Sequence, residues 1–450
     1  MIDINHNILK KEDETIDLLV GDDALTQIQD NKFISDWGSL YDLCPWSTVF
    51  QKSEFVTTWY RVYQDRCVPI IVRAKNNGKL TGLLTLAKSN ERHIFGAGGN
   101  QAEYQVWLTA EHDSKVFIKK ALDLLLKRFP KATIHLKYIP YSTPISWINS
   151  DPFWKKQCIV QSFKQPLLFV DEENLTRELR KKNRREKLNR LKRLGELKFE
   201  RITEFNDFTS IINELATQFD FRKGATVNIN PFKDDPLKIK FMLALFEQNL
   251  VHVTILKIDN EIIASNVGAM GKKWVHLQGI NTHSPFYAKH SPGILHFLML
   301  GKLMVEEHFD VFDLTPGGDS YKDGLANQSK QAFELTVGSQ KNISIKKLQL
   351  KFTNYTKLTL SKAGAKRTTI KDIKKRIWII TNKASQINKQ SIKSLVTDFF
   401  FILKTTKKEE IYSVNPRTLI NLPDHTIPIN KLNLNDLLDY DGRGAWRTRW

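Results

Sequence analysis

The feature that most constrains this fold is an order of secondary-structure patterns that occurs twice. Residues 68–170 and residues 251–338 each show a hairpin, a third strand, a loop, a helix, a strand, a turn and a last strand. No residue-level repeat is visible between the two segments. A shared order of elements without such a repeat indicates two copies of one fold rather than an array of short repeats. Strands and helices mixed in this way favour the α/β (α+β) class.

Turn residues define the two hairpins. The first turn is Lys-Asn-Asn-Gly at 75–78, and the second is Asp-Asn at 259–260. Apolar runs lie on both sides of each turn, as expected for paired strands. In the second copy, a third strand at 274–279 is followed by a polar loop at 280–290 and by an apolar helix at 294–308.

The net charge of +19 is concentrated in two windows. Residues 177–201 hold twelve Lys and Arg against four Glu, and residues 341–410 hold eighteen Lys and Arg against four acids. These windows carry +8 and +14, so the rest of the chain carries −3. Such local basicity suits an anionic ligand, a nucleic acid or an anionic membrane surface. A solvated, salt-bridged helix is an equally good interpretation of the first window.

Cysteine usage and the lack of long apolar runs set the expected compartment. Cys44, Cys67 and Cys158 are far apart and form no CxxC pair, which argues against a disulfide framework or a cysteine zinc site. No metal is expected. The sequence begins without a signal-peptide pattern and has no run of 18 apolar residues. We therefore expect a soluble, cytoplasmic protein.

The first candidate site is the stretch 312–322, Phe-Asp-Leu-Thr-Pro-Gly-Gly-Asp-Ser-Tyr-Lys. A short apolar strand ends here at a Pro-Gly-Gly break, and Asp319, Tyr321 and Lys322 follow directly. An acid, a phenol and an amine at the end of a strand are a common way to build a site. A plain β-turn with solvent-facing polar residues would have the same composition.

The second candidate is the helix start at Ser291, Pro292 and Gly293. Serine favours the N-cap position, proline favours the first helical position, and glycine lets a ligand approach the backbone. The free N–H groups of a helix start form a phosphate or pyrophosphate site, although every helix also needs capping. Three antiparallel strands, a loop, this helix start and another strand is the order by which an acyltransferase holds coenzyme A. No GxGxxG pattern indicates a Rossmann cofactor instead.

These two motifs carry a resemblance to a known family. His-Ser-Pro-Gly at 290–293, followed by the stretch 312–322, resembles the GNAT-related acyltransferases of the cellulose-biosynthesis (CelD-like) group. The basic, Leu-striped segment 180–194 and the loop 99–108 also resemble that group, which is similar to the Fem-type aminoacyl transferases. The resemblance covers about residues 37–340. It implies two tandem GNAT-like domains, each a mixed, mostly antiparallel sheet flanked by helices, plus a basic C-terminal appendage.

The expected divisions follow from this resemblance. They are an N-terminal arm at 1–30, a first GNAT-like half at 31–172, a second at 173–345 and a basic helical extension at 346–450. The helix of the first half begins at Glu-His-Asp-Ser, where the acids would repel phosphate. We therefore expect a degenerate site in the first half and acyl-CoA binding by the second half alone.

The resemblance implies transfer of an acyl group, acetyl in the simplest case, from acyl-CoA to an amine or hydroxyl acceptor such as a sugar or polysaccharide precursor. Lys322 would stabilise negative charge or bind an anionic acceptor, Tyr321 would protonate the departing thiolate, and Asp319 would act as base. The expected catalytic residues are Asp319, Tyr321, Lys322 and, as second choice of base, His283. The expected cofactor-binding residues are Ser291, Gly293 and Ile294, and the expected substrate-binding residues are Glu103, Tyr104, Arg184, Arg185 and Arg222.

Two other functions fit the same sequence. A Fem-like transferase would use aminoacyl-tRNA, with the basic helix 177–194 and the basic region 341–410 as the tRNA surface. A non-catalytic module would instead dock its basic tail on a membrane-bound synthase or on anionic lipid. The sequence lacks an evident aromatic-rich RNA platform, so acyl transfer from acyl-CoA ranks first.

Overall fold

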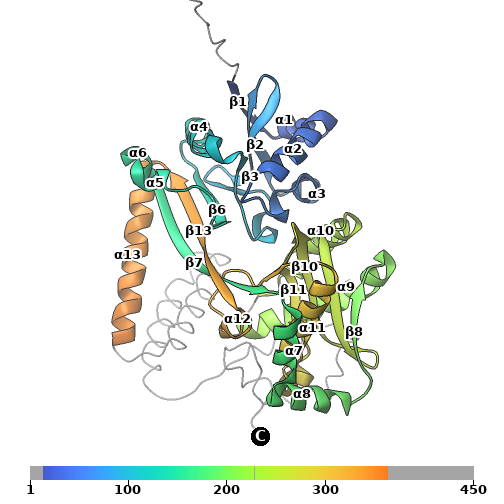
Figure 1. Ribbon diagram of the computed structural model, residues 1–450. Helices are drawn as coiled ribbons and strands as arrows, with labels where there is room; N and C mark the ends of the chain where they lie inside the picture. The colour runs from blue at the N-terminus through green and yellow to red at the C-terminus, as the bar shows by residue number, and fades with distance from the viewer. Residues whose placement is uncertain (1–13, 228, 363–450) are drawn as a thin grey trace, which may run out of the picture.

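The computed structural model describes residues 14–227 and 229–362, which share one 13-stranded mixed sheet flanked by helices. The strand order is β1-β2-β3-β4-β6-β13-β7-β12-β11-β10-β9-β8, and β5 pairs separately with β3. In Figure 1 the strands β1 to β4 and the strands β8 to β11 lie at opposite ends of the molecule. The sheet therefore has two outer portions, one from each half of the sequence, that meet in the middle.

The first half of the chain supplies seven strands and six α-helices within the described residues. The strands are β1 (Glu14–Val20), β2 (Val68–Asn76), β3 (Lys79–Asn90), β4 (His93–Gly96), β5 (Leu108–Thr109), β6 (Thr133–Ile139) and β7 (Cys158–Phe169). The helices are α1 (Asp22–Gln27), α2 (Asn31–Leu43), α3 (Ser53–Tyr63), α4 (Ser114–Arg128), α5 (Trp147–Ser150) and α6 (Pro152–Gln157). Short 3₁₀ turns lie at Val49–Gln51, Gly99–Gln101 and Glu111–Asp113.

The second half supplies the remaining described elements. Its strands are β8 (Leu197–Ile202), β9 (Val251–Ile258), β10 (Glu261–Gly271), β11 (Trp274–His283), β12 (Val311–Asp313) and β13 (Gln328–Gly338). Its helices are α7 (Glu172–Arg180), α8 (Lys182–Lys192), α9 (Phe205–Val227), α10 (Leu237–Glu247), α11 (Pro292–Glu306), α12 (Ser320–Leu325) and α13 (Gln340–Lys362). A 3₁₀ turn, Pro285–His290, precedes α11.

Both predicted hairpins are confirmed. β2 pairs with β3 and β9 pairs with β10, in each case antiparallel and along most of their length. Asn77 and Gly78 have φ of 50° and 78°, and Asp259 has φ of 53°. These left-handed conformations are the ones that tight hairpin turns require, and Asn, Gly and Asp adopt them most readily.

The duplicated order of elements is also confirmed. In the first half β4 and β6 pair in parallel across α4, and in the second half β11 and β12 pair in parallel across α11. Each parallel pair extends over only three residue positions. Two tandem halves with the same mixed sheet and the same crossover helix are the architecture expected from the sequence.

The two halves exchange strands at the centre of the sheet. β13 pairs antiparallel with β7 from Gln328↔Leu167 to Val337↔Cys158, and its other edge pairs with β6. The end of β7 in turn pairs with β12. Figure 1 shows β7 and β13 side by side as a long two-stranded ribbon that runs from one half to the other. Each half therefore completes its sheet with a strand that the other half supplies.

An apolar interface also joins the halves. The ring of Phe241 on α10 packs edge-to-face against Phe55 on α3 at 5.3 Å and against Tyr63 at 6.3 Å. One continuous cluster of buried apolar side chains contains residues of both halves, including Val72, Trp107, Leu245 and Val267. The halves thus share a core in addition to their strands, which makes free rotation of one half against the other costly.

Several helices and strands differ in extent from the sequence expectation. The charged helix expected at 175–194 is two helices, α7 and α8, because Lys181 takes an extended ψ of 134° between them. Helix α9 ends at Val227, and the cations of Arg222 and Lys223 lie about 5.3 and 5.4 Å from the ring of Phe219. These cation–π contacts favour the last turns of the helix.

The third strand of the second hairpin is longer than predicted. It was expected to end at Gly279, but β11 continues to His283 because β10 pairs with it as far as Ala264↔His283. Gly279 has φ of 130°, and a Cβ atom there would lie 2.1 Å from the carbonyl oxygen of Val267, so glycine is required for close strand pairing. His283 consequently lies at the end of a strand and not in a loop.

Two expectations concern the ends of the chain. Residues 14–27, expected within an N-terminal arm, include strand β1, which pairs along its whole length with β2. The helical extension expected at 346–450 is described only as far as Lys362 at the end of α13, and residues 363–450 lie outside the described residues. Among the described helices, none has the length and apolar character needed to cross a membrane.

Candidate active site

The candidate site lies where β11 and β12 separate. The two strands pair in parallel only at Trp274↔Val311, Val275↔Phe312 and His276↔Asp313. β12 ends at Asp313, whereas β11 continues for seven residues along β10. Past His276, β11 therefore has an open edge among the described strands, and the start of α11, the end of α9 and α12 approach this edge.

A pocket of about 70 Å³ occupies this region, and residues from all these elements line it. The lining residues are Arg222, Asn281, Thr282, His283, Ala288, Ser291, Gly293, Ile294, Phe297 and Tyr321. Six of them are residues that the sequence predicted for the site: Arg222, His283, Ser291, Gly293, Ile294 and Tyr321. Residues far apart in the sequence thus converge on one cavity, as a binding site requires.

His283 is the titratable group at the end of β11. Burial, and then the charge of Arg222, lower the pKa of its imidazole to about 4. Its ring is therefore neutral near pH 7, and its unprotonated nitrogen is a weaker base than that of an ordinary histidine. A Cβ atom on Gly293 would lie 3.5 Å from Nδ1 of His283, an ordinary contact distance, so the start of α11 lies directly beside the imidazole.

The start of α11 combines backbone and side-chain donors. Ser291 occupies the predicted N-cap position and Pro292 begins the helix. Ser291 has a left-handed φ of 53° and makes no side-chain capping bond; its hydroxyl instead accepts a hydrogen bond of 2.9 Å from Nζ of Lys187 on α8. Among the described residues, the N–H of Gly293 has no acceptor. Burial, and then the charges of Arg184 and Arg190, lower the pKa of Lys187, which indicates a concentration of positive charge here.

The turn after β12 is held by buried polar contacts. The N–H of Thr315 donates to Oδ1 of Asp313 at 2.9 Å, and Nζ of Lys322 donates to the carbonyl and hydroxyl oxygens of Thr315, both at 3.2 Å. Lys322 is only 6% exposed, and burial lowers its pKa. Asp319 lies apart, because its side chain is 54% exposed and its carboxylate is 3.9 Å from Nζ of Lys322.

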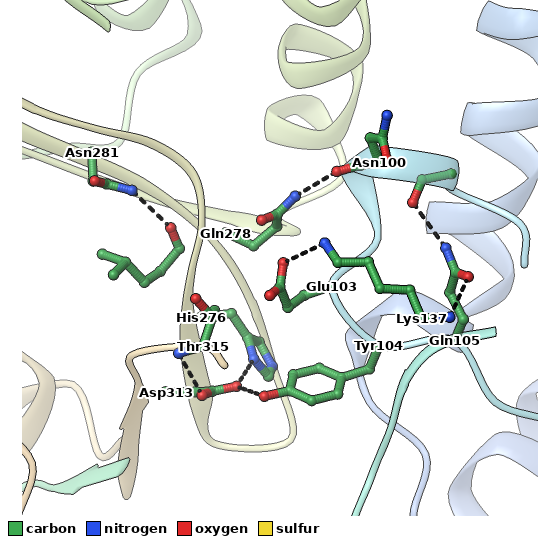
Figure 2. Close-up of polar contacts among 12 residues, drawn as sticks. Asn100, Glu103, Tyr104, Gln105, Lys137, His276, Gln278, Asn281, Asp313 and Thr315 are labelled. Carbon is green, nitrogen blue, oxygen red and sulfur yellow. Dashed lines mark hydrogen bonds and ion pairs between the residues drawn. The ribbon is translucent and has the colours of Figure 1, made fainter. Parts of the chain in front are cut away.

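Glu103 and Tyr104 lie between the two halves, as expected (Figure 2). The hydroxyl of Tyr104 donates to Oδ2 of Asp313 at 2.6 Å, and Nδ1 of His276 lies 2.9 Å from the same oxygen. Glu103 accepts a hydrogen bond of 3.2 Å from Lys137, and burial raises the pKa of its carboxyl. Neither residue lines the pocket; the hydrogen bond of Tyr104 to Asp313 joins the halves, whereas Lys137, the partner of Glu103, belongs to the first half.

The predicted arginines take different positions. Arg222 donates to the side-chain oxygen of Asn281 at 2.9 Å inside the pocket. Arg184 forms an ion pair with Glu178 across the break between α7 and α8. Arg185 is exposed on α8. Of these three residues, only Arg222 lines the pocket.

The structure also adds residues that the sequence reasoning missed. Lys187 was one of twelve basic residues in its window, and nothing in the sequence distinguished it from the others. Asp313 and His276 form a buried contact between strands, which periodicity does not predict. One signal was present for Asp313: it is an acid inside the apolar run Val311-Phe-Asp-Leu, and a buried acid needs hydrogen-bond donors.

An open strand edge, a helix start with free and cationic donors, and a neutral histidine thus lie together in the second half. Residues 178–323, from α7 into α12, match the family model described as an acetyltransferase (GNAT) domain. A GNAT-type acyltransferase fold is therefore present in the second half. A comparison with curated protein sequences gave no match.

Solved structures similar to the chain have low sequence identity. FemX matches with a TM-score of 0.48 and 9% identity, over 69% of this chain and 98% of that one. L-PGS from Bacillus licheniformis matches with a TM-score of 0.44 and 9% identity, over 70% and 94%. A tandem GNAT protein from the clavulanic acid biosynthesis pathway matches with a TM-score of 0.40 and 11% identity, over 71% and 98%.

Proposed function

We propose that the protein transfers an acyl group from acyl-CoA to an amine or hydroxyl acceptor, with a sugar or polysaccharide precursor as the acceptor class. The observation that carries the proposal is the pocket at the start of α11, where Ser291, Gly293 and Lys187 present donors beside a neutral His283. The GNAT match over residues 178–323 supports the same reaction class. The cytoplasm, where acyl-CoA is available, is the proposed location.

The donors at the start of α11 suit the pyrophosphate of coenzyme A. The ammonium of Lys187 donates to the Ser291 hydroxyl, the N–H of Gly293 lies in the first turn of α11, and the dipole of α11 adds positive partial charge. The first half offers no such arrangement, because Glu111 and Asp113 precede α4. We therefore propose a single acyl-CoA site, in the second half.

In this proposal, different residues in and near the pocket have different roles in the reaction. The sequence favoured Asp319 as the base and His283 as the second choice. Because Asp319 is 54% exposed and does not line the pocket, we propose that His283, neutral near pH 7, accepts the proton from the acceptor as it attacks, with Asp319 as the alternative base. Tyr321, whose ring stacks on Phe297, donates a proton to the departing thiolate. The ammonium of Lys322 stabilises the negative charge that develops during transfer. Arg222 binds and orients the acceptor.

The test is titration of the purified protein with acetyl-CoA by calorimetry. Lys187→Ala is expected to weaken binding by about tenfold to a hundredfold, because a charge-assisted contact contributes roughly 1.5–3 kcal/mol. Lys192→Ala, an exposed position on the same helix, is the control and should change the affinity less than about twofold. The double variant Ser291→Ala, Gly293→Asp should bind more weakly still, since it places a carboxylate against the pyrophosphate.

Unchanged affinity in both Lys187→Ala and the double variant would remove the support for an acyl-CoA site here. The Gly293→Asp change is sterically mild, because a Cβ at this position meets its nearest atom at an ordinary 3.5 Å. A loss of binding would therefore report on the charge and bulk that aspartate adds at the pocket and not on a collapsed helix start.

A second candidate is aminoacyl transfer from an aminoacyl-tRNA, and exposed basic residues on α8 favour it. Arg185, Arg190 and Lys192 point into solvent, in addition to the Lys187 that reaches Ser291. Single-stranded RNA contacts give a slope of about −0.7 per phosphate in a plot of log affinity against log salt. Salt-sensitive tRNA binding that Arg185→Ala and Arg190→Ala reduce would favour this function over acyl-CoA chemistry.

A non-catalytic role is the remaining proposal. In it, the basic C-terminal region would dock the protein on a membrane-bound synthase or on anionic lipid. Loss of binding to both acetyl-CoA and tRNA, together with retained binding to vesicles that contain an anionic phospholipid, would support this role.

A further inference from the structure

A chain of hydrogen bonds runs from the first half of the protein to Lys322. Figure 2 shows its first links: the hydroxyl of Tyr104 donates to one oxygen of Asp313 at 2.6 Å, and the N–H of Thr315 donates to the other at 2.9 Å. The last link is Nζ of Lys322, which donates to the carbonyl and hydroxyl oxygens of Thr315 at 3.2 Å. Tyr104 is 209 residues from Asp313 in sequence, so the chain connects the two halves.

Every member of this hydrogen-bond chain is buried. Tyr104 is 1% exposed, Asp313 is fully buried, and Thr315 and Lys322 are 7% and 6% exposed. A buried carboxylate is costly unless donors surround it, so the position of Asp313 depends on its partners. The raised pKa of Tyr104, caused by burial and then by the charge of Asp313, keeps its hydroxyl protonated as a donor.

Thr315 connects Asp313 to Lys322, so the position of Asp313 affects that of Lys322. Its φ of 61° is left-handed, which a β-branched residue rarely adopts and which costs about 1–3 kcal/mol. The bond from its N–H to Asp313 offsets this strain and fixes the direction of its carbonyl oxygen. Lys322 reaches that oxygen, so the geometry of the turn determines where the ammonium lies.

The ammonium lies close enough to the pocket to interact with one of its charged residues. Besides burial, the charge of Arg222, which lines the pocket, contributes to the lowered pKa of Lys322, and the neighbouring Tyr321 on α12 also lines the pocket. A Cβ atom on Gly317 would lie 3.3 Å from Nζ of Lys322, so the glycine keeps the space beside the ammonium open. A lysine with two of its three donors bound to one residue has a restricted position.

We propose that Tyr104 and Asp313 are positioning residues, through which the first half holds the Thr315 turn and so fixes the Lys322 ammonium beside the acyl-transfer pocket. This inference rests on the proposed function for its catalytic meaning. It assigns to the first half, which carries no acyl-CoA pocket of its own in the proposal, a direct part in ordering the site. The ammonium then meets developing negative charge without first having to be ordered.

The first test measures how fast an amine-acylating reagent, N-hydroxysuccinimidyl acetate, labels Lys322 in the folded protein. Mass spectrometry of the digested protein reports the label on the peptide that contains Lys322. Tyr104→Phe and Thr315→Val each remove one link, and both are expected to speed labelling by at least about threefold, because local opening exposes the amine. Tyr60→Phe is the matched control: its buried hydroxyl donates to the carbonyl of Leu86 at 2.7 Å, outside this chain. Thr315→Ser keeps the hydroxyl and should restore slow labelling.

The second test measures acyl transfer with acetyl-CoA. Tyr104→Phe and Thr315→Val are expected to lower kcat by about tenfold while the KM for acetyl-CoA stays within about twofold, since the cofactor contacts are untouched. Unchanged labelling of Lys322 in Tyr104→Phe, or an equal effect of Tyr60→Phe, would overturn the positioning role; Thr315→Val reports only on the last link, between Thr315 and Lys322. Should Tyr104→Phe fail to fold, Asp313→Asn, which alters the group that accepts from both Tyr104 and Thr315, decides the question. If the wild type transfers no acyl group, the proposed function fails, while the labelling rates still decide whether Tyr104 positions Lys322.

Discussion

The depressed pKa of His283 makes a quantitative prediction about stability. The imidazole has a pKa of about 4 in the folded protein, because it is buried and lies near Arg222, whereas an unfolded histidine has a pKa of about 6.5. Below pH 6.5 the unfolded chain binds a proton at this position and the folded chain does not. The contribution of His283 to stability is therefore full above pH 6.5 and is lost progressively as the pH falls towards 4.

The size of the loss follows from the two pKa values. Between pH 7.5 and pH 4.5, a group with these values lowers the free energy of unfolding by about 2.5 kcal/mol. His283→Asn removes the titrating group, so the variant should lose about 2.5 kcal/mol less than the wild type over the same pH interval. Any direct cost of the substitution cancels, because it is present at both pH values.

The assay is urea denaturation of both proteins at pH 7.5 and pH 4.5, followed by tryptophan fluorescence and circular dichroism. His112→Asn, at a side chain that is 81% exposed, provides the same replacement at the surface. If the wild type and His283→Asn lose the same stability within about 0.5 kcal/mol, His283 does not have a depressed pKa, and its role as a neutral proton acceptor in the pocket loses its basis.

Two further predictions concern buried contacts. Tyr104→Phe should lower the free energy of unfolding by about 1.5–3 kcal/mol, since it removes a donor from a buried carboxylate; urea denaturation at pH 7.5 measures this, and a loss below about 0.5 kcal/mol would contradict it. Gly268→Ala would place a Cβ atom 2.2 Å from the carbonyl oxygen of His276, so about 3 kcal/mol or more of stability should be lost, seen as insoluble protein or a lower urea midpoint. Gly318→Ala, with no atom within 4 Å, is its control and should stay within about 0.5 kcal/mol of the wild type.

Much of the fold was predictable because its signals are local. The turns at 75–78 and 259–260 contain residues that tolerate positive φ, and the strands beside them followed from apolar runs. The extent of β11 was not predictable in this way, because its last residues, up to His283, are strand only through pairing with β10. The break at Lys181 also has no breaker residue in the sequence; ion pairs of Glu178 with Lys181 and Arg184 accompany it.

In the candidate site, too, residues with a local sequence signal were predictable and residues defined by distant contacts were not. Ser291, Gly293 and Tyr321 belong to two short motifs whose residue types indicated a ligand site, and the structure places all three at one pocket. Contacts between distant segments were not accessible to the same reasoning. Lys187 reaches Ser291 across 104 residues, and Tyr104 reaches Asp313 across 209. Such contacts depend on how helices and strands pack, and a single sequence does not report it.

The strand exchange at the centre of the sheet has a consequence for synthesis of the protein. One edge of β6, complete once Ile139 has left the ribosome, has β13 as its native partner, and β13 begins only at Gln328. At about 5–20 residues per second, this edge waits roughly 10 to 40 s for its partner. During that interval the nascent first half presents unpaired backbone groups, which are a template for wrong pairing with other chains. The yield of folded protein therefore depends on how soon β13 follows β6 during synthesis. Slow translation of residues 140–338 would give aggregation more time and would reduce this yield.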